Sequence, residues 1–274
     1  MYHSSLMTNH IGQAGSKLSP RIWSRLQNTA LTPDGTAPGV EIFDDFANFG
    51  QAASGSDVSG GYAAYLDTGC TIKQTAESGG VIQFTADTDN EQASLITGGN
   101  SGSFGAISDT AGEDKLTLFE ARVAFGQIGN TYNAFVGLGA PGDIGDSLPH
   151  TDVGAFAAAT DLIGFSVLEA DGDSLRFIHK KTGSATTTTV MTYGTALVAD
   201  TWYNLGFVYD PKEPTSTRIK IFINNIEQTT YVTSTGIASA TFPDGAQLAM
   251  LADIHAGGAA QTMKMDVWRC YQEG

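Results

Sequence analysis

The segment from Thr201 to Gln228, TWYNLGFVYDPKEPTSTRIKIFINNIEQ, constrains the fold more than any other part of the chain. Large apolar residues recur at every second position in two stretches, and a polar loop with two prolines separates them. This period predicts two strands with a buried face, joined by a loop that cannot continue a central strand. Asn224-Asn225 then predicts a tight turn, because asparagine tolerates a positive φ angle. The residues expected to share one face are Tyr203, Leu205, Phe207 and Tyr209 in the first strand and Ile219, Ile221 and Ile223 in the second.

The same alternation runs through most of the chain after Val40, where helical patterns are nearly absent. It predicts about 15 short strands at the spacing typical of a β-sandwich. Hairpins are expected at Asp171-Gly172-Asp173 and at Thr182-Gly183-Ser184. The expected strands are Glu41–Phe46, Tyr62–Leu66, Thr71–Thr75, Val81–Ala86, Ala93–Thr97, Lys115–Phe125, Ala134–Gly139, Leu162–Leu168, Ser174–His179, Thr186–Met191, Tyr203–Tyr209, Arg218–Ile223, Thr229–Thr233, Gln247–Asp253 and Met263–Tyr271.

Three further segments follow a recognisable order around this strand pair: Ile42–Phe46, Leu118–Phe125 and Met263–Tyr271. Together they resemble an all-β, concanavalin A-like or laminin-G-like jelly-roll sandwich, as found in tailed-phage virion accessory proteins (decoration or fibre). The resemblance covers most of residues 41–274 and implies that the closing strand packs beside the first. This fold serves lectins, glycosidases and virion proteins alike, so it does not by itself identify a function.

Residues 1–40 differ from the body and are expected to form an N-terminal arm and linker, with the sandwich spanning 41–274. No acidic residue precedes Asp34, although the whole chain carries 29 acidic against 14 basic residues. Ser19-Pro20 suits a helix start, and apolar residues follow at helical spacing. A helix of about ten residues is marginal alone in water, so its apolar stripe needs the chain's own body or another protein. The candidate docking residues are Lys17, Leu18, Arg21, Ile22, Trp23, Arg25 and Leu26.

Charge and hydropathy exclude several classes of protein. The net charge of −15 disfavours nucleic-acid binding, which needs a concentrated basic surface. No apolar run approaches the ~20 residues of a membrane-spanning helix, and the N-terminus lacks the apolar core of a secretory signal. Cys70 lies at the start of an early expected strand and Cys270 within the last one, and the early and final strands often neighbour each other in jelly rolls. A disulfide is therefore geometrically possible, and buried free thiols are the favoured interpretation.

No catalytic pattern is complete, so no enzyme activity and no cofactor are expected. Many glycosidases of this fold place acids as Glu-x-Asp-x-x-Glu on one strand. The nearest match, Glu169-Ala-Asp171-Gly-Asp173, has the wrong spacing and a turn glycine. The segment Gly137–Gly142 matches a dinucleotide fingerprint but opens no helix. Of the scattered histidines, His179 lies in an expected strand and is interpreted as structural.

Two sets of binding residues are candidates. Asp143, Asp146 and Asp152, with His150 among them, form an acidic loop that is a weak calcium candidate, with solvated charges as the default. Exposed aromatic side chains stack on sugars, although most aromatic residues of a sandwich belong to its core. The aromatic candidates for carbohydrate binding are Tyr132, Tyr193, Trp202 and Tyr231.

The combined features favour a non-enzymatic virion structural protein, either a capsid decoration protein or a head or tail accessory protein. Its arm would dock on other virion proteins such as the major capsid protein, in a virion assembled in the host cytoplasm, and homo-oligomers are expected. The alternative is a carbohydrate-binding lectin module that attaches to a host through a cell-surface glycan. A glycoside hydrolase ranks last because its signature acids are missing.

Overall fold

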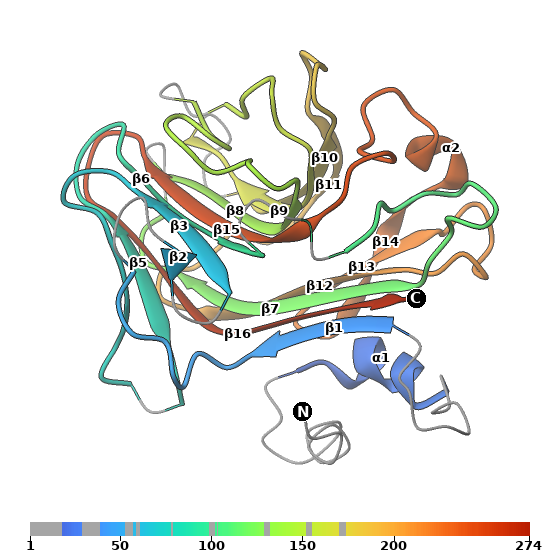
Figure 1. Cartoon of the computed structure of the whole chain (residues 1–274), viewed down its shortest axis with the longest axis horizontal. Coiled ribbons are helices and arrows are strands. Elements are labelled where there is room, and N and C mark those ends of the chain that lie inside the picture. The colour runs from blue at the N-terminus through green and yellow to red at the C-terminus, as the bar shows by residue number, and fades with distance from the viewer. Residues whose placement is uncertain are drawn as a thin grey trace.

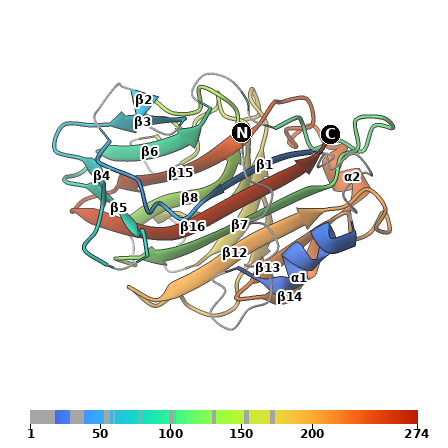
Figure 2. The same ribbon diagram turned by 60° about the horizontal axis from the view of Figure 1, so that its bottom comes forward.

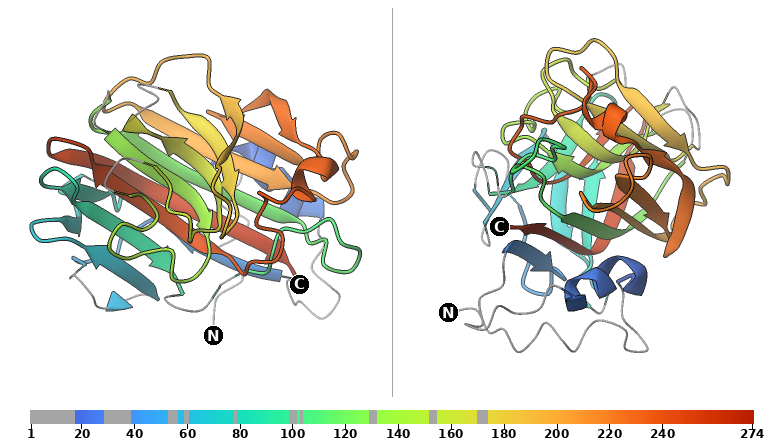
Figure 3. Two further views of the ribbon diagram at one scale, coloured as in Figure 1. Left: turned by 90° about the horizontal axis from the view of Figure 1, so that it is seen from above. Right: turned by 90° about the vertical axis from the view of Figure 1, so that its right-hand side faces the viewer.

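The computed structural model describes residues 18–28, 39–52, 57–58, 61–77, 79–98, 102, 104–128, 132–151, 155–169 and 174–274. Their strands form two antiparallel sheets that pack face to face as a sandwich (Figures 1 and 3). The all-β jelly roll expected from the sequence is thus confirmed. No helix among the described residues is long and apolar enough to cross a membrane.

Sheet I contains the two strands of the 201–228 segment, and it also contains the first and the last strand of the sandwich. β16 pairs with β7 on one side, and on the other with β5 and then, over its last residues, with β1. The expected proximity of the opening and closing strands is therefore confirmed. The order is β14 (Ile226–Val232), β13 (Ile219–Ile223), β12 (Trp202–Tyr209), β7 (Thr117–Phe125), β16 (Gln261–Glu273), β5 (Ile82–Ala86) and β4 (Thr71–Gln74), with β1 (Gly39–Asp44) beside β16.

Sheet II faces sheet I across the core and also contains eight strands. Neighbouring strands in it come from distant parts of the sequence, because β15 lies between β8 and β6. The order is β11 (Thr188–Thr192), β10 (Arg176–Lys180), β9 (Leu162–Val167), β8 (Tyr132–Gly139), β15 (Ala249–Ala256), β6 (Gln92–Thr97), β3 (Tyr62–Leu66) and β2 (Asp57–Val58).

The hairpin predicted at 201–228 forms as expected. β12 and β13 pair antiparallel, and Asn224 and Asn225 adopt φ angles of 51° and 62° in the turn. The predicted face of both strands lies in the core between the sheets. The opposite face is also partly apolar, because Val208 and Phe222 pack against the N-terminal helix. Because of this second contact, both faces of the hairpin carry apolar residues.

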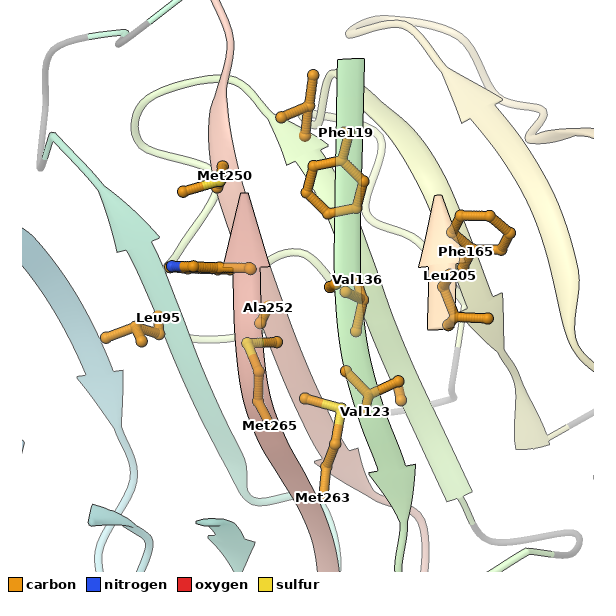
Figure 4. Close-up of a cluster of buried hydrophobic side chains, with 14 of the residues drawn as sticks. Leu95, Phe119, Val123, Val136, Phe165, Leu205, Met250, Ala252, Met263 and Met265 are labelled. Carbon is orange, nitrogen blue, oxygen red and sulfur yellow. The ribbon is translucent and has the colours of Figure 1, made fainter. Parts of the chain in front are cut away.

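The core consists of side chains that point inward from both sheets (Figure 4). Cys70 and Cys270 are both buried and free, as the sequence favoured. Burial raises the pKa of the Cys70 thiol to about 11 and that of Cys270 well above its usual range. The labelled core residues are Leu95, Val136, Phe165, Met250 and Ala252 from sheet II and Phe119, Val123, Leu205, Met263 and Met265 from sheet I.

The N-terminal helix lies on the outer face of sheet I (Figure 2). α1 (Pro20–Trp23) begins after Ser19 with proline in its first turn, as predicted, and continues into the 3₁₀ turn η2 (Ser24–Asn28). Ser19 does not cap the helix with its side chain; its hydroxyl donates to Glu120 of β7 instead (2.5 Å). Ile22 and Trp23 are fully buried against the sheet.

A buried carboxylate anchors this helix. Glu120 accepts the backbone N–H of Ser19 (2.9 and 3.0 Å to its two oxygens) and the indole N–H of Trp23 (2.6 Å). Burial raises the pKa of Glu120, and these hydrogen bonds act against that rise. At the helix end, Arg25 pairs with Asp210 (2.8 Å) and Glu213 (3.0 Å).

The apolar stripe therefore finds its partner in the chain's own sandwich. This corrects the expectation that it docks on another protein, because Leu18, Ile22 and Trp23 are buried and Leu26 packs against the same cluster. Arg21 is exposed, and Lys17 lies outside the described residues. The short elements β2 and α2 (Ser234–Ile237) were not expected, and the sandwich begins at Gly39.

Candidate functional site

Polar side chains gather on the outer face of sheet II, although almost all of them are buried. On β15, Asp253 and His255 face outward while Ala252 and Ile254 point into the core. Strand pairing places His255 opposite Gln92 of β6 and Asn133 of β8. Polar side chains therefore lie side by side on three neighbouring strands. We call this set the polar row; its members are Tyr65, Gln92, Ser94, Asn133, Ser166, Arg176, Asp253 and His255.

Asp253 is the centre of the polar row. Its Oδ1 accepts hydrogen bonds from the Ser94 hydroxyl (2.5 Å) and from Nε2 of Gln92 (2.7 Å). Its Oδ2 lies 2.5 Å from Nδ1 of His150. All of these side chains are buried. Since an ionised carboxylate only accepts hydrogen bonds, this set of donors holds Asp253 in one orientation as an acceptor.

His150 reaches the row from the segment that joins β8 to β9. This segment folds back on itself through bridges between Gly145 and Leu148 and between His150 and Phe156. Gln92 also donates to the carbonyl oxygen of Leu148, which fastens the segment to β6. The Phe156 ring lies 4.6 Å from the His150 ring and 5.9 Å from that of Phe135, between centroids. The segment thus covers the middle of the row, while Tyr65 and Arg176 at its ends are half-buried.

Several polar atoms in this region are buried beyond the reach of any hydrogen-bonding group in the described residues. They are Oε1 of Gln92, Nδ2 of Asn133, Nε2 of His150 and Oγ of Ser166. A buried donor or acceptor without a partner costs about 1–3 kcal/mol. Because these atoms belong to neighbouring elements on one face, they form a surface that can donate to and accept from a ligand rich in hydroxyl groups.

The aromatic residues proposed to bind carbohydrate do not converge. Tyr132 is fully buried in the core, where its ring lies 6.0 Å from that of Phe125, so it offers no ring face to a ligand. Tyr193 is half-buried and packs against the core. Trp202 and Tyr231 lie on strands of sheet I rather than sheet II.

Register separates these last two aromatic residues. Tyr231 is opposite Lys220, which is opposite Val208, and Val208 is six residues from Trp202 along β12. At a rise of about 3.3 Å per residue, the two aromatic positions are about 20 Å apart. The Arg122 guanidinium lies 4.5 Å from the Trp202 ring centroid and pairs with Asp266, so one face of the indole is occupied.

The calcium candidates are also separated. The Asp143 carboxylate accepts the backbone N–H groups of Ala140 and Asp161 (both 2.9 Å) and so fastens its own loop; burial raises its pKa to about 7. Asp146 is exposed, and Asp152 lies outside the described residues. Within the described part of the chain, no group of three or more His, Cys, Asp or Glu side chains is arranged to hold a metal ion.

The remaining candidates have structural surroundings. Glu169 donates its backbone N–H to Oδ1 of Asn133 (2.8 Å), whereas Asp171 and Asp173 lie outside the described residues. His179 donates through Nδ1 to the Thr241 carbonyl (3.1 Å) beside Phe242, in accordance with its predicted structural role. Burial lowers the pKa of this imidazole.

Sequence reasoning missed the pair of His150 and Asp253, which are 103 residues apart. The one available signal was the alternation of β15, where Asp253 and His255 interrupt an otherwise apolar strand at outward positions. That signal places two polar residues on one face. It does not reveal that a distant loop brings a histidine onto them.

No protein-family model and no curated protein matches the sequence. Solved structures do match, at low identity. An endo-β-1,4-glucuronan lyase from the fungus Trichoderma reesei has a TM-score of 0.54 and 10% identity, covering 84% of this chain and 94% of its own. The potassium-bound carbohydrate recognition domain of Emp46p has a TM-score of 0.52 and 11% identity, covering 85% and 95%.

A Bacteroides ovatus GH16 protein of a mixed-linkage glucan locus, in complex with an oligosaccharide product, has a TM-score of 0.52 and 12% identity, covering 83% and 98%. At such low identity these likenesses establish architecture and not activity. The chain has the concanavalin A-like jelly-roll fold that carbohydrate recognition domains, glycoside hydrolases and polysaccharide lyases share.

Proposed function

We propose that this protein binds carbohydrate along the polar row on the outer face of sheet II. The observation that carries the proposal is the group of buried polar atoms, on neighbouring elements, that no described protein group satisfies. A sugar hydroxyl both donates and accepts, so a saccharide can meet amide, imidazole and hydroxyl groups together. The names of the structural neighbours, which include a carbohydrate recognition domain, support this reading.

The surroundings of the row supply the apolar contact that sugar rings also need. Phe135 lies in the row between Asp253 and Ser166, and Phe156 packs on it from the covering segment. A saccharide that reaches the middle of the row must displace part of the segment that covers it, while His150 stays hydrogen-bonded to Asp253. Binding is therefore coupled to a local movement, whose cost reduces the net affinity.

We propose binding without cleavage. A retaining glycosidase needs two carboxyl groups about 5–5.5 Å apart, and an inverting enzyme needs them about 6.5–9.5 Å apart. Of the residues that define the polar row, only Asp253 is a carboxylate, and Ser94, Gln92 and His150 already engage it. A glycosidase mechanism has no second acid in this set.

In the virion hypothesis the N-terminal arm docks on other virion proteins, and the apolar stripe of that arm packs against the chain's own sheet I. Those apolar residues are therefore not free to dock, whereas the polar row supports glycan binding. Attachment to a host-surface glycan is the finer form of the proposal. The virion role is tested separately by seeking the protein in purified particles.

Ser166→Ala is the sharpest test. The hydroxyl of Ser166 has no hydrogen-bond partner among the described residues, so its loss should not destabilise the free protein and should raise the free energy of unfolding by up to about 1–3 kcal/mol. On a glycan array, the full chain should give signal that weakens about tenfold in this variant, as one lost hydrogen bond in a ligand site predicts. Tyr231→Phe, on the exposed edge strand β14, is the matched control and should bind like the wild type. Absence of any glycan signal, or equal binding by Ser166→Ala, would contradict the proposal.

A further inference from the structure

We infer that His150 determines the specificity of this site, by accepting a hydrogen bond from a ligand hydroxyl through Nε2, and that the ligand is a neutral saccharide. The inference rests on the proposed function and names the ligand class for the same polar row. It follows from the tautomer that Asp253 imposes and from the charges around the imidazole.

The protonation of His150 follows from its partner. Nδ1 lies 2.5 Å from a carboxylate oxygen, which accepts and does not donate, so Nδ1 carries the proton. In a neutral imidazole the other nitrogen is then an acceptor. Ser94 and Gln92 donate to the other oxygen of Asp253 and hold this carboxylate in place. The carboxylate in turn fixes the tautomer of His150.

The position of Nε2 makes it a ligand contact. It is buried, and no hydrogen-bonding group of the described residues reaches it. The ring is held between Asp253 and the Phe156 ring, so the acceptor cannot rotate away at low cost. A ligand that fills this place must present a donor, which a sugar hydroxyl does and a carboxylate or sulfate does not.

The charges near His150 also disfavour an acidic ligand. The groups beside the ring are Asp253 and His255 from β15 and Phe156 from its own segment. Gln92 and Ser94 from β6 hydrogen-bond to Asp253. Burial, and then the charge of Asp253, raises the pKa of Tyr132 on the core side of the sheet. The polar row's cation, Arg176, is three strands from Asp253, or about 14 Å at normal strand spacing.

Two substitutions separate the roles of the two ring nitrogens. In His150→Asn the side-chain amide can still donate to Asp253 from near the Nδ1 position, but no atom occupies the place of Nε2. In His150→Gln an amide group extends to the place of Nε2 and can present its oxygen there. We expect His150→Asn to weaken binding about tenfold and His150→Gln to stay within about threefold of the wild type.

The experiment is calorimetric titration of the full chain with laminaritetraose and cellotetraose as neutral probes and tetragalacturonate as the acidic probe. The wild type should bind a neutral probe in preference to tetragalacturonate, His150→Gln should bind that neutral probe within about threefold of the wild type, and His150→Asn should bind it about tenfold more weakly. Equal affinity of His150→Asn and the wild type, or preference for tetragalacturonate, overturns the inference while leaving carbohydrate binding intact. Binding of no probe, with a blank glycan array, overturns the proposed function itself.

Spectroscopy covers the case in which a variant does not fold. The imidazole ¹⁵N resonances of wild-type His150 should show a protonated Nδ1 before ligand is added. Saturation with the bound neutral probe should then shift the Nε2 resonance and leave Nδ1 nearly unchanged. An Nε2 resonance that does not move on saturation overturns the inference.

Discussion

Trp23→Ala tests the conclusion that the N-terminal helix is an integral part of this fold. The side chain is fully buried between the helix and sheet I. Truncation of a buried tryptophan to alanine costs about 3–5 kcal/mol. Its indole N–H also donates to Glu120 (2.6 Å), and the Arg269 guanidinium lies 4.0 Å from its ring centroid.

The apolar packing, the indole hydrogen bond and the contact with Arg269 are all lost together in Trp23→Ala, so their separate energies do not simply add. The remaining donors to Glu120, from Ser19 and Asn204, limit the cost of the lost indole bond. We therefore expect the free energy of unfolding to fall by about 4–5 kcal/mol in total. For a chain of this size, that lowers Tm by roughly 8–20 °C.

The assay is urea and thermal unfolding of the full chain, followed by circular dichroism. Trp202→Ala is the matched control, because this half-buried tryptophan also lies under an arginine, at 4.5 Å. It should cost about 1–2 kcal/mol, from partial burial and a cation–π contact. Trp23→Phe keeps most apolar contact and loses the indole donor, so it should cost about 1.5–3 kcal/mol. A loss below about 1 kcal/mol in Trp23→Ala would refute the packing of the helix on sheet I.

Two further predictions concern buried titratable groups. Burial raises the pKa of Asp143 from 3.8 to about 7, so its contribution to stability is present at acidic pH and is lost as pH rises between these values. Asp143→Asn should therefore be more stable than the wild type at pH 8, by up to about 4 kcal/mol, and similar to it at pH 4; urea midpoints that differ equally at both pH values would contradict this. Cys70 and Cys270 are buried free thiols, so both should resist a thiol reagent in the native protein and react after denaturation. Recovery of a disulfide-linked peptide by mass spectrometry would disprove it.

The strands could be predicted from the sequence because apolar residues at every second position indicate directly which side of a strand is buried. Tyr62–Leu66 was predicted at its observed bounds, and the predicted Asn224-Asn225 turn has positive φ at both residues. The predicted ends of strands were less accurate, since β14 begins at Ile226 and was predicted to begin at Thr229. Strand ends depend on hydrogen bonds to neighbours that only the sheet supplies.

The partner of the N-terminal helix could not be predicted from the sequence. Leu18, Ile22, Trp23 and Leu26 predicted an apolar stripe that needs a partner, and both possible partners were left open. The partner is a set of outward apolar residues on sheet I, including Leu118, which alternation alone cannot distinguish from exposed positions. Glu120 at the middle of β7 was likewise unremarkable in the sequence, although it anchors the helix.

The sequence by itself determined the all-β architecture, the 201–228 hairpin and the short N-terminal helix, because each depends on residues close together in the chain. Only the tertiary structure decided which surface is a candidate site. The polar row joins side chains from β3, β6, β8, β9, β10 and β15, and His150 reaches it from a loop. The predicted aromatic residues and acidic loop residues do not converge, since convergence depends on strand order and register. Those are set by contacts between distant segments, as when β16 closes the sandwich beside β1.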